Sequence, residues 1–444
     1  MNTNLRTFYT IALTQVLSII GSRISALALS IYVFTETQSA TPIALVMFFI
    51  IVPQILLSGV GGALADRWNR RLLMLLADVG QAAGTILLLA SFVSGTFEIW
   101  HLYVIVTIQS MFSAFQRPAL QASITMLVPD EQRDRANAIQ QMGGPIANII
   151  APAVAGLLFS AFGVVGAILI DLATFLIAVL VISRVSIPQP KQTAEGAMLK
   201  GSLFKESFYG LQYIWARKGL LGLVLFFAMI NLLATGYSAL ETPYLLARTQ
   251  DTSVLGILLS ISSAGALIGG ILYGVWGGTK SRIHTVMGAM MLAMLGLVLL
   301  GMSQTWWMLA LSTLLLMTPL PMINAAAASI IQATVAPDVQ GRVFAALQQI
   351  SMLMMPIGML AVGPLADHVF EPAVGGAGWA RFAPFVGTSF GSGMGLLIMI
   401  AGGIAFVLTI LAYSVPVIRN VEKSLADSVP TQPVPVSTPE VAVA

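Results

Sequence analysis

The stretch Gly61-Gly62-Ala63-Leu64-Ala65-Asp66-Arg67-Trp68-Asn69-Arg70-Arg71 lies between two long apolar segments and holds an acid and three arginines within six residues. Only 9% of the whole chain is charged. Because charged side chains are costly in hydrocarbon, the stretch predicts a short water-facing turn between two membrane helices. The paired glycines allow neighbouring backbones to approach closely. We interpret the turn as a gate or a hinge contact rather than a catalytic loop.

The composition of the chain indicates a membrane protein. Of its 444 residues, 57% are hydrophobic, and the mean hydropathy is +0.90. A soluble protein would carry roughly a quarter charged residues. Most of this chain consists of apolar runs near the length of about 20 residues that a membrane helix needs, without the short alternating segments of a membrane β-barrel. The sequence therefore predicts an all-α polytopic membrane protein.

Several classes of function are disfavoured. The chain has no cysteine and only three histidines, which are far apart, so we expect no metal site and no cofactor. The net charge of +3 comes from residues scattered between apolar runs, so no nucleic-acid partner is expected. The segment 274–281 approaches a phosphate-loop pattern, but Thr279 stands where that pattern needs glycine. No nucleophile–base pattern indicates an enzyme.

Twelve transmembrane helices in two pseudo-symmetric six-helix bundles are predicted from the apolar runs. The spans are residues 8–34, 42–64, 72–94, 100–126, 136–160, 163–185, 219–242, 253–276, 283–303, 305–332, 343–366 and 390–416. The fourth and tenth contain prolines, which membrane helices tolerate. The predicted organisation is a first bundle at 1–185, a linker at 186–218, a second bundle at 219–423 and a disordered tail at 424–444. The linker's end has helical spacing of apolar residues, which fits either the membrane surface or the protein's own face.

The distribution of Lys and Arg predicts the orientation. The loops on one side of the predicted spans carry most of these residues, whereas the loops on the other side carry only Arg248 and Arg381. Because positive loops stay in the cytoplasm, both termini and the opening motif are expected there. We expect the lipid bilayer to be the protein's environment.

An internal repeat relates the two halves. Pro129-Asp130-Glu131-Gln132 and Pro337-Asp338-Val339-Gln340 begin similar stretches at an offset of 208 residues (337 minus 129). The same offset places Gly61-Gly62-Ala63-Leu64 on Gly269-Gly270-Ile271-Leu272 and Trp68 on Trp276, but Asp66 and Arg67 on Gly274 and Val275. Two halves of the same orientation form a parallel repeat, whose substrate sites tend to lie at mid-depth between the halves. The charged turn belongs to one half only.

The pattern Gly62-x-x-x-Asp66-Arg67-x-x-Arg70-Arg71 resembles the signature of the major facilitator superfamily, with Asn69 where that family usually has glycine. The stretches 129–141, 151–156, 341–344 and 363–367 resemble the bacterial branch that contains macrolide-efflux and enterobactin-export proteins. The resemblance covers essentially the whole chain. It implies the major facilitator fold and a secondary active transporter in a bacterial plasma (inner) membrane, working by alternating access and functional as a monomer. It implies proton-coupled antiport that exports hydrophobic or amphipathic small molecules; the alternative is a dedicated transporter of one endogenous metabolite, such as a siderophore.

In that superfamily the first motif closes the cytoplasmic side. The resemblance and the charge pattern assign this gate to Gly62, Asp66, Arg67, Arg70, Arg71, Asp130 and Arg342. A carboxylate at position 66 would meet the positive N-terminal end of the eleventh span, which begins near Arg342. The two later arginines would pair with acids of the 129–134 loop. The alternative is that the arginines only set topology and bind anionic headgroups.

Polar residues inside the spans are candidates for the substrate and proton pathway. They are Arg23, Asp171, Asn231, Glu241, Gln109 and Gln116. Arg23 and Asp171 lie at similar predicted depths, which allows an ion pair that is either functional or only fixes helix packing. Glu241 fits a proton carrier or a headgroup-level acid. Gln109 stands where many antiporters of the superfamily carry arginine, which departs from their usual proton relay.

The fifth span contains Ala147-x-x-x-Ala151-Pro152-x-x-Ala155-Gly156, which is similar to a motif of antiporter members of the superfamily. Three glycines of that motif are alanine here. Small residues and a proline permit close helix contact and a bend. Ala151, Pro152 and Gly156 are therefore predicted to form a helix-packing motif, and a plain packing contact is the alternative to an antiport role.

Overall fold

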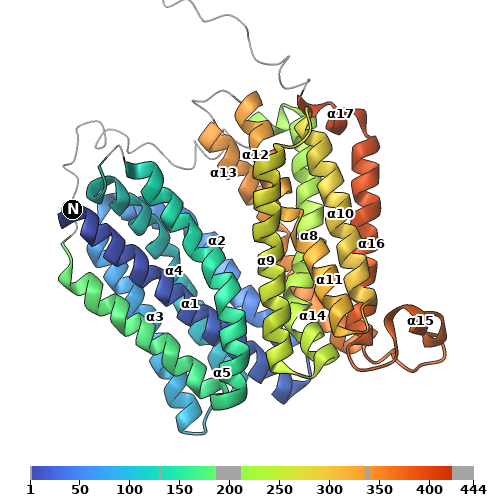
Figure 1. Ribbon diagram of the computed structural model, residues 1–444, viewed down its shortest axis with the longest axis horizontal. Coiled ribbons are helices and arrows are strands. Elements are labelled where there is room, and N and C mark those ends of the chain that lie inside the picture. Colours follow the sequence, from blue (N-terminus) through green and yellow to red (C-terminus); the bar gives the residue numbers. More distant parts are fainter. Residues whose placement is uncertain (1–2, 130–131, 187–211, 336–339, 423–444) are drawn as a thin grey trace, which may run out of the picture.

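The computed structural model describes residues 3–129, 132–186, 212–335 and 340–422. All regular elements in this part of the chain are helices, which confirms the predicted all-α class. They form two bundles that stand side by side in Figure 1. The N-terminal bundle contains α1 (Thr3–Thr37), α2 (Thr41–Arg67), α3 (Arg70–Val93), α4 (Ile99–Leu127) and α5 (Arg133–Arg184).

The C-terminal bundle includes several broken helices. Its long helices are α8 (Lys218–Thr249), α9 (Thr252–Trp276), α10 (Arg282–Met302) and α16 (Ser392–Ser414). Its broken helices are α11 (Trp306–Met317) with α12 (Leu320–Thr334), and α13 (Gln340–Leu353) with α14 (Met355–Leu365) and the π-helix η2 (Ala366–Phe370). The short elements are η3 (Trp379–Arg381), α15 (Ala383–Val386) and α17 (Pro416–Arg419).

These elements correspond to the twelve predicted crossings. Nine helices in the described residues are long and apolar enough to cross a membrane, and one of them covers 43 residues. Such a length, about 65 Å, is twice a bilayer core. The helix α5 turns back at Gly163, where φ is 65°, a value that glycine adopts without strain. Figure 1 shows the two halves of α5 running in opposite directions.

The repeat predicted from the sequence is visible in the helix bounds. Shifting α2 and α4 by 208 residues gives 249–275 and 307–335, close to α9 and to the α11–α12 pair. The first half of α5, residues 133–162, maps in the same way onto 341–370, close to the range of α13, α14 and η2. The last span departs, because a connection over residues 371–391 delays α16 by about 20 residues relative to the shifted sixth span. The two halves therefore share register over five spans but not over the sixth.

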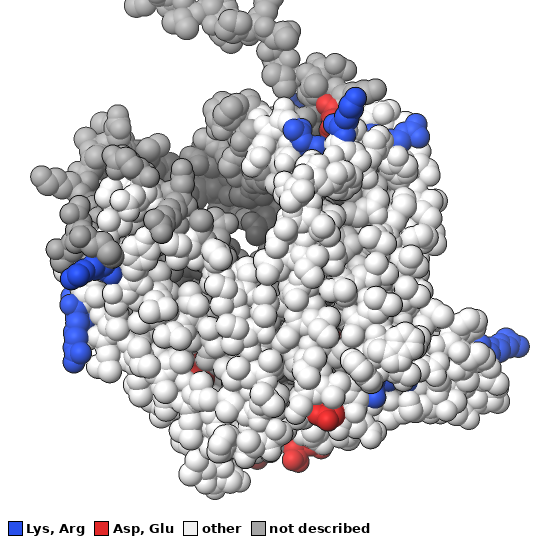
Figure 2. Space-filling model, viewed as in Figure 1, with Lys and Arg blue, Asp and Glu red and all other residues white. Residues whose placement is uncertain are grey.

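The outer surface of the bundles is apolar, as a lipid-facing surface requires. Val275 is 86% exposed and Leu311 is 62% exposed. In Figure 2, Lys and Arg gather mainly at the end that carries α17, and Asp and Glu at the opposite end. We call the first end the basic side; it contains the beginnings of α3 and α10. We call the opposite end, with residues 38–40 and η2, the clasp side.

Contacts between the two bundles are made by α5 with α9, α2 with α14 and α1 with α8. At the clasp side, a Cβ on Gly363 of α14 would lie 2.6 Å from Cα of Thr41 in α2. Phe34 and Phe390 stack there with ring centroids 6.1 Å apart. Figure 2 shows a hollow between the bundles toward the basic side.

Candidate functional site

A polar face runs along α3 inside the N-terminal bundle. Asp78, Gln81 and Thr85 are spaced three and four residues apart and therefore lie on one side of the helix. Asp78 is completely buried, and Thr85 is 1% exposed. Buried polar groups in an apolar bundle require hydrogen-bond partners, and these come from α1, α4 and α5.

Asp78 is held by two glutamines. The side-chain nitrogen of Gln116 in α4 donates to one carboxylate oxygen at 2.5 Å, and that of Gln15 in α1 donates to the other at 3.3 Å. The same nitrogen of Gln116 also donates to Oε1 of Gln15 at 2.9 Å. Because this nitrogen serves two acceptors, the orientation of the Gln116 amide is determined by the network. No cationic side chain is bonded to Asp78 within the described residues.

Two further amides extend the network along α3. Gln81 donates to Oε1 of Gln116 at 3.1 Å. Gln109 of α4 donates to the backbone oxygen of Gln81 at 3.0 Å and to Oγ1 of Thr85 at 3.1 Å. Gly84 makes room for this amide, since a Cβ there would lie 2.7 Å from Cγ of Gln109. The structure thus brings Gln109 and Gln116, both predicted from the sequence, into one network.

Asp171 of α5 ends the network on the clasp side. Ser22 donates to its Oδ1 at 2.9 Å and Thr85 to its Oδ2 at 3.1 Å, and the residue is 5% exposed. Asp78 and Thr85 are seven residues apart on α3, so the two carboxylates differ in depth by about 10 Å. Among the described residues, no ion pair joins Asp171 to Arg23, whose side chain is exposed. The ion pair considered from the sequence is not formed, because hydroxyls occupy both carboxylate oxygens.

The remaining predicted pathway residues lie in the C-terminal bundle. Glu241 accepts a hydrogen bond of 3.0 Å from the hydroxyl of Tyr237, one turn earlier on α8, and also bonds Ser262 of α9. Asn231 donates to the backbone oxygen of Ser351 in α13 at 3.1 Å. Neither residue belongs to the network of the N-terminal bundle. The structure therefore separates the predicted pathway set into two groups.

The predicted cytoplasmic gate is only partly described. Gly62, Asp66 and Arg67 lie in the last turns of α2 and Arg342 in the first turn of α13, but their side chains, like the whole of Asp130, are outside the described residues. Arg70 begins α3, after Asn69, which caps this helix by accepting from the backbone N–H of Leu72.

Arg71 contacts the end of another helix of its own bundle. Its Nε donates to the backbone oxygen of Ile182 at 3.0 Å, and its Nη2 donates to that of Ser183. It thereby caps the C-terminal end of α5, where unpaired carbonyls attract positive charge. The acids of the 129–134 loop that were predicted as partners of Arg71 have side chains outside the described residues, so their pairing with Arg71 stays a prediction.

A polar contact between the bundles lies on the clasp side. Asp367 of η2 accepts hydrogen bonds from the backbone N–H of Ala40 at 2.9 Å and of Thr41 at 2.8 Å. The hydroxyls of Ser39 and Thr41 donate to the same carboxylate. We call these residues the trans cap. Ala40 precedes α2 and has no side-chain acceptor of its own, so Asp367 of the other bundle takes the capping role.

The crossing of α5 and α9 is the second close contact. A Cβ on Gly156 would lie 2.5 Å from the carbonyl oxygen of Thr252, and a Cβ on Gly256 would lie 2.5 Å from that of Pro152. Ala151 is buried beside them. The predicted packing residues are therefore found at an interface between the bundles, at a place where backbones meet directly.

A second carboxylate follows the trans cap on the same chain segment. Glu371 accepts from the backbone N–H of Met394 at 2.8 Å and of Gly391 at 3.3 Å, at the beginning of α16. Burial raises the pKa of Glu371, and these N–H groups and the charge of Arg248 oppose that shift. This cap stays within the C-terminal bundle, so it anchors the segment that carries Asp367.

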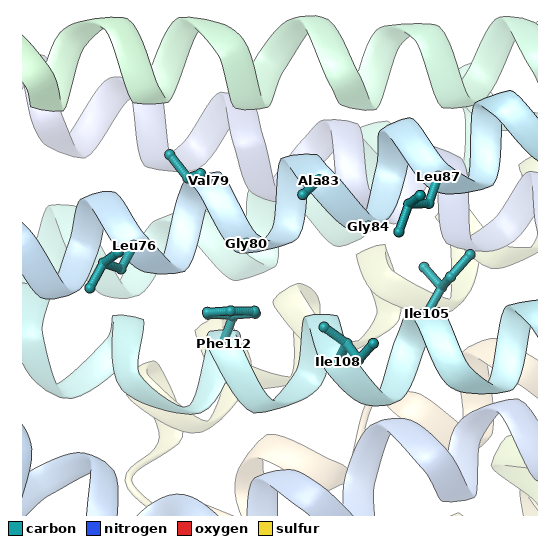
Figure 3. Close-up of a pocket in the computed structure, with 9 residues that line it drawn as sticks. All are labelled: Leu76, Val79, Gly80, Ala83, Gly84, Leu87, Ile105, Ile108 and Phe112. Atoms are coloured by element: carbon teal, nitrogen blue, oxygen red, sulfur yellow. The ribbon is translucent and has the colours of Figure 1, made fainter.

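An apolar pocket of about 230 Å³ lies between α3 and α4. Figure 3 shows Gly80 and Gly84 opposite Phe112 and Ile108, with only apolar side chains around the space. Drug-sized ligands occupy roughly 300–1,000 Å³ and need some polar contacts. The pocket is too small and too apolar to be the transport site.

Several residues of these sites were not predicted from the sequence, among them Asp78, Thr85 and Asp367. Asp78 and Thr85 could have been found from the polar spacing with Gln81 inside an apolar span. Asp367 could have been noted as an acid at the end of the eleventh span. Its partners 39–41 lie more than 300 residues away, and no local pattern connects them.

Comparisons with known proteins agree with this architecture. Residues 11–359 match the family model of the Major Facilitator Superfamily. The chain is 28% identical over 366 residues to macrolide efflux protein A of Streptococcus pyogenes, covering 82% of this chain and 90% of that protein. It is 22% identical over 371 residues to the multidrug efflux pump Tap of Mycolicibacterium fortuitum, covering 78% and 86%.

Solved structures share the fold at low identity. A bacterial homolog of the human lysosomal transporter Spinster, in an inward-facing and unoccupied conformation, has a TM-score of 0.66 and 15% identity, with 96% of this chain and 99% of that chain covered. A point mutant of the nucleoside transporter NupG has a TM-score of 0.70 and 15% identity, with 92% and 99% covered. The family match extends over most of the chain, and the helices show the corresponding fold. The chain belongs to the major facilitator superfamily, whose members are membrane transporters of small molecules and not enzymes.

Proposed function

We propose that this secondary transporter exports hydrophobic or amphipathic small molecules in exchange for protons. Membership of the superfamily supports alternating access, in which two bundles close alternately on either side of a central substrate. The observation that carries the proposal is that the two bundles are joined on the clasp side. There the trans cap and the α5–α9 glycine contacts join the bundles, while the hollow between them lies toward the basic side.

The orientation follows from charge. Loops rich in Lys and Arg remain in the cytoplasm, so the basic side and both termini are assigned to the cytoplasm of a bacterial cell. The described conformation is then inward-facing. In the opposite state Asp66 and Arg67 would hold the cytoplasmic ends together, and the trans cap would be open.

The choice of substrate class rests on relatives. Macrolide efflux protein A and the pump Tap are named for macrolides and for multiple drugs, and both align with more than three quarters of this chain. Proton coupling is supported by Asp78 and Asp171, two buried carboxylates without a bonded cation in the described part of the bundle. Buried acids of this kind are functional candidates in membrane proteins.

Cell accumulation assays test the substrate class. Cells that express the protein should accumulate ethidium and erythromycin more slowly than cells with an empty vector. Equal accumulation across a panel of lipophilic cations and macrolides would reject export of this class and direct the search to a single metabolite. Transport assays in proteoliposomes with an imposed pH gradient test the coupling to protons. A transport rate that does not depend on the gradient would reject proton coupling.

The cytoplasmic gate has its own test. Asp66→Asn should slow transport more than it weakens substrate binding, because the gate contributes to the conformational change and not to the substrate site. Transport rates in proteoliposomes and binding of ethidium to purified protein separate the two effects. An unchanged transport rate would remove Asp66 from the gate.

A further inference from the structure

Asp171 and Asp78 differ in the kind of partner that surrounds them. Both oxygens of Asp171 are contacted by hydroxyls, those of Ser22 and Thr85. Both oxygens of Asp78 are contacted by amide nitrogens. A hydroxyl can donate one hydrogen bond and accept two, whereas an amide nitrogen only donates. The hydroxyl partners of Asp171 can therefore accept a hydrogen bond from a protonated carboxyl group, whereas the amide nitrogens around Asp78 cannot.

Thr85 has a second acceptor within reach. Its Oγ1 lies 3.1 Å from Oδ2 of Asp171 and 3.3 Å from the backbone oxygen of Gln81. It also accepts a hydrogen bond of 3.1 Å from Gln109. The single hydroxyl hydrogen can point to one of the two oxygens at a time.

We propose that Thr85 is a positioning residue that lets Asp171 bind and release the coupling proton inside the closed bundle. The inference rests on the proposed proton coupling and adds the residue that adapts to both charge states. With Asp171 ionised, Thr85 donates to Oδ2. With Asp171 protonated, the new O–H donates to Oγ1, and the Thr85 hydrogen turns to the carbonyl of Gln81. One proton is added from water. The Thr85 hydrogen then shares the carbonyl oxygen of Gln81 with the Gln109 amide, so each of these buried donors still faces an acceptor.

The same exchange is not available at Asp78. A proton on its carboxylate would face amide nitrogens that cannot accept it, and the Gln116 amide cannot turn without losing its bond to Gln15. Unpaired buried donors are costly. Asp171 is therefore the carboxylate of the network that suits reversible protonation.

Other charged or titratable groups on the helices packed against α5 do not bind Asp171 directly. Within the described residues these groups include Arg23 and Tyr32 of α1, Asp78 of α3, Tyr103 of α4 and Tyr273 of α9. None of these is hydrogen-bonded to Asp171. Its proton affinity therefore depends on the hydroxyls more than on a neighbouring charge.

The test is a pH titration of the full-length protein in lipid nanodiscs, read from the infrared carbonyl band of protonated carboxyl groups. Asp171→Asn should remove one titrating component. In the Thr85→Val protein, Asp171 should bind the proton about tenfold more tightly, which moves that component up by about one pH unit. The reason is that the hydrogen bond lost from the ionised carboxylate is worth more than the one lost from the neutral carboxyl group. Thr85→Ser should restore the wild-type titration.

Thr14→Val is the matched control. Thr14 is buried in α1, and its hydroxyl bonds only backbone oxygens of its own helix, so its loss should leave the titration unchanged. A Thr85→Val titration that matches wild type overturns the inference, as does an Asp171→Asn protein whose ethidium export remains driven by a pH gradient. If wild-type export ignores the gradient, the proposed coupling fails, while the infrared titration still decides whether Thr85 acts on Asp171.

Discussion

The carboxylate of Asp367 caps a helix of the opposite bundle by accepting both the backbone N–H and the hydroxyl of Thr41. The same hydrogen bonds therefore cap α2 and hold the two bundles together on the clasp side. When the bundles part on this side, water replaces the carboxylate at the first turn of α2. The segment that carries Asp367 stays attached to α16 through Glu371.

Asp367→Ala should shift the protein toward opening on the clasp side. Loss of a helix cap costs about 0.5–2 kcal/mol, which corresponds to a change of about two- to thirtyfold in the equilibrium. Because the chain has no cysteine, Thr96 and Thr388 can be replaced by cysteine and spin-labelled without other changes. Distances between the labels should lengthen in the variant.

Glu371→Gln is the control for this prediction, because it alters a carboxylate cap inside one bundle. Its label distances should match those of the unaltered protein. A distance distribution that Asp367→Ala leaves unchanged would show that the trans cap does not hold the clasp side closed.

Gly256→Val should prevent full closure of the clasp side. Its new Cβ would stand 2.5 Å from the carbonyl oxygen of Pro152, and a backbone atom in a helix cannot move aside. Gly274→Val in the same helix has open space around it and should behave as wild type. Spin-label distances across α5 and α9 distinguish the two; equal distances would contradict the role of the glycine contact.

Asp78→Ala should destabilise the N-terminal bundle. It removes the acceptor of one N–H of Gln15 and of one N–H of Gln116, at a cost of about 1–3 kcal/mol for each buried donor. Asp78→Asn keeps one acceptor oxygen and should lose less. Thermal unfolding in detergent, followed by tryptophan fluorescence, measures the difference; equal midpoints for the two variants would contradict this account.

Arg71→Ala should lower thermal stability without changing the conformational equilibrium. The side chain caps the end of α5 inside one bundle, an interaction worth about 1 kcal/mol. Lys280→Ala removes an exposed charge at the basic side and serves as the control. A shift in spin-label distances with Arg71→Ala would contradict this expectation and would support the predicted gate role of Arg71.

Much of the architecture could be predicted from the sequence because membrane helices are encoded locally. An apolar run of sufficient length must form a helix in lipid, and the repeat at 208 residues follows from matching residues such as Trp68 and Trp276. The separate apolar runs predicted at 136–160 and 163–185 correspond to the two halves of α5. The function class followed from the opening motif, which the family match then supported.

Pairings between distant side chains were not accessible in the same way. The depth of Arg23 and Asp171 suggested an ion pair, but helix rotation points Arg23 away and gives Asp171 to Ser22 and Thr85. The bonds that Arg71 donates to the carbonyls of α5 could not be predicted for a similar reason. Rotation about a helix axis is set by packing with neighbours and not by the apolar run itself.

Two related sets of membrane helices, with a charged turn in only one half, can be predicted from the linear chain, because hydrophobic length and repeat offset are properties of that chain. The cap that Asp367 provides for α2 and the hydrogen-bonded network that Asp78 and Asp171 share depend on the packing of distant helices. Those contacts depend on which helix faces meet, because buried polar groups find their hydrogen-bond partners across the whole bundle rather than within any one span.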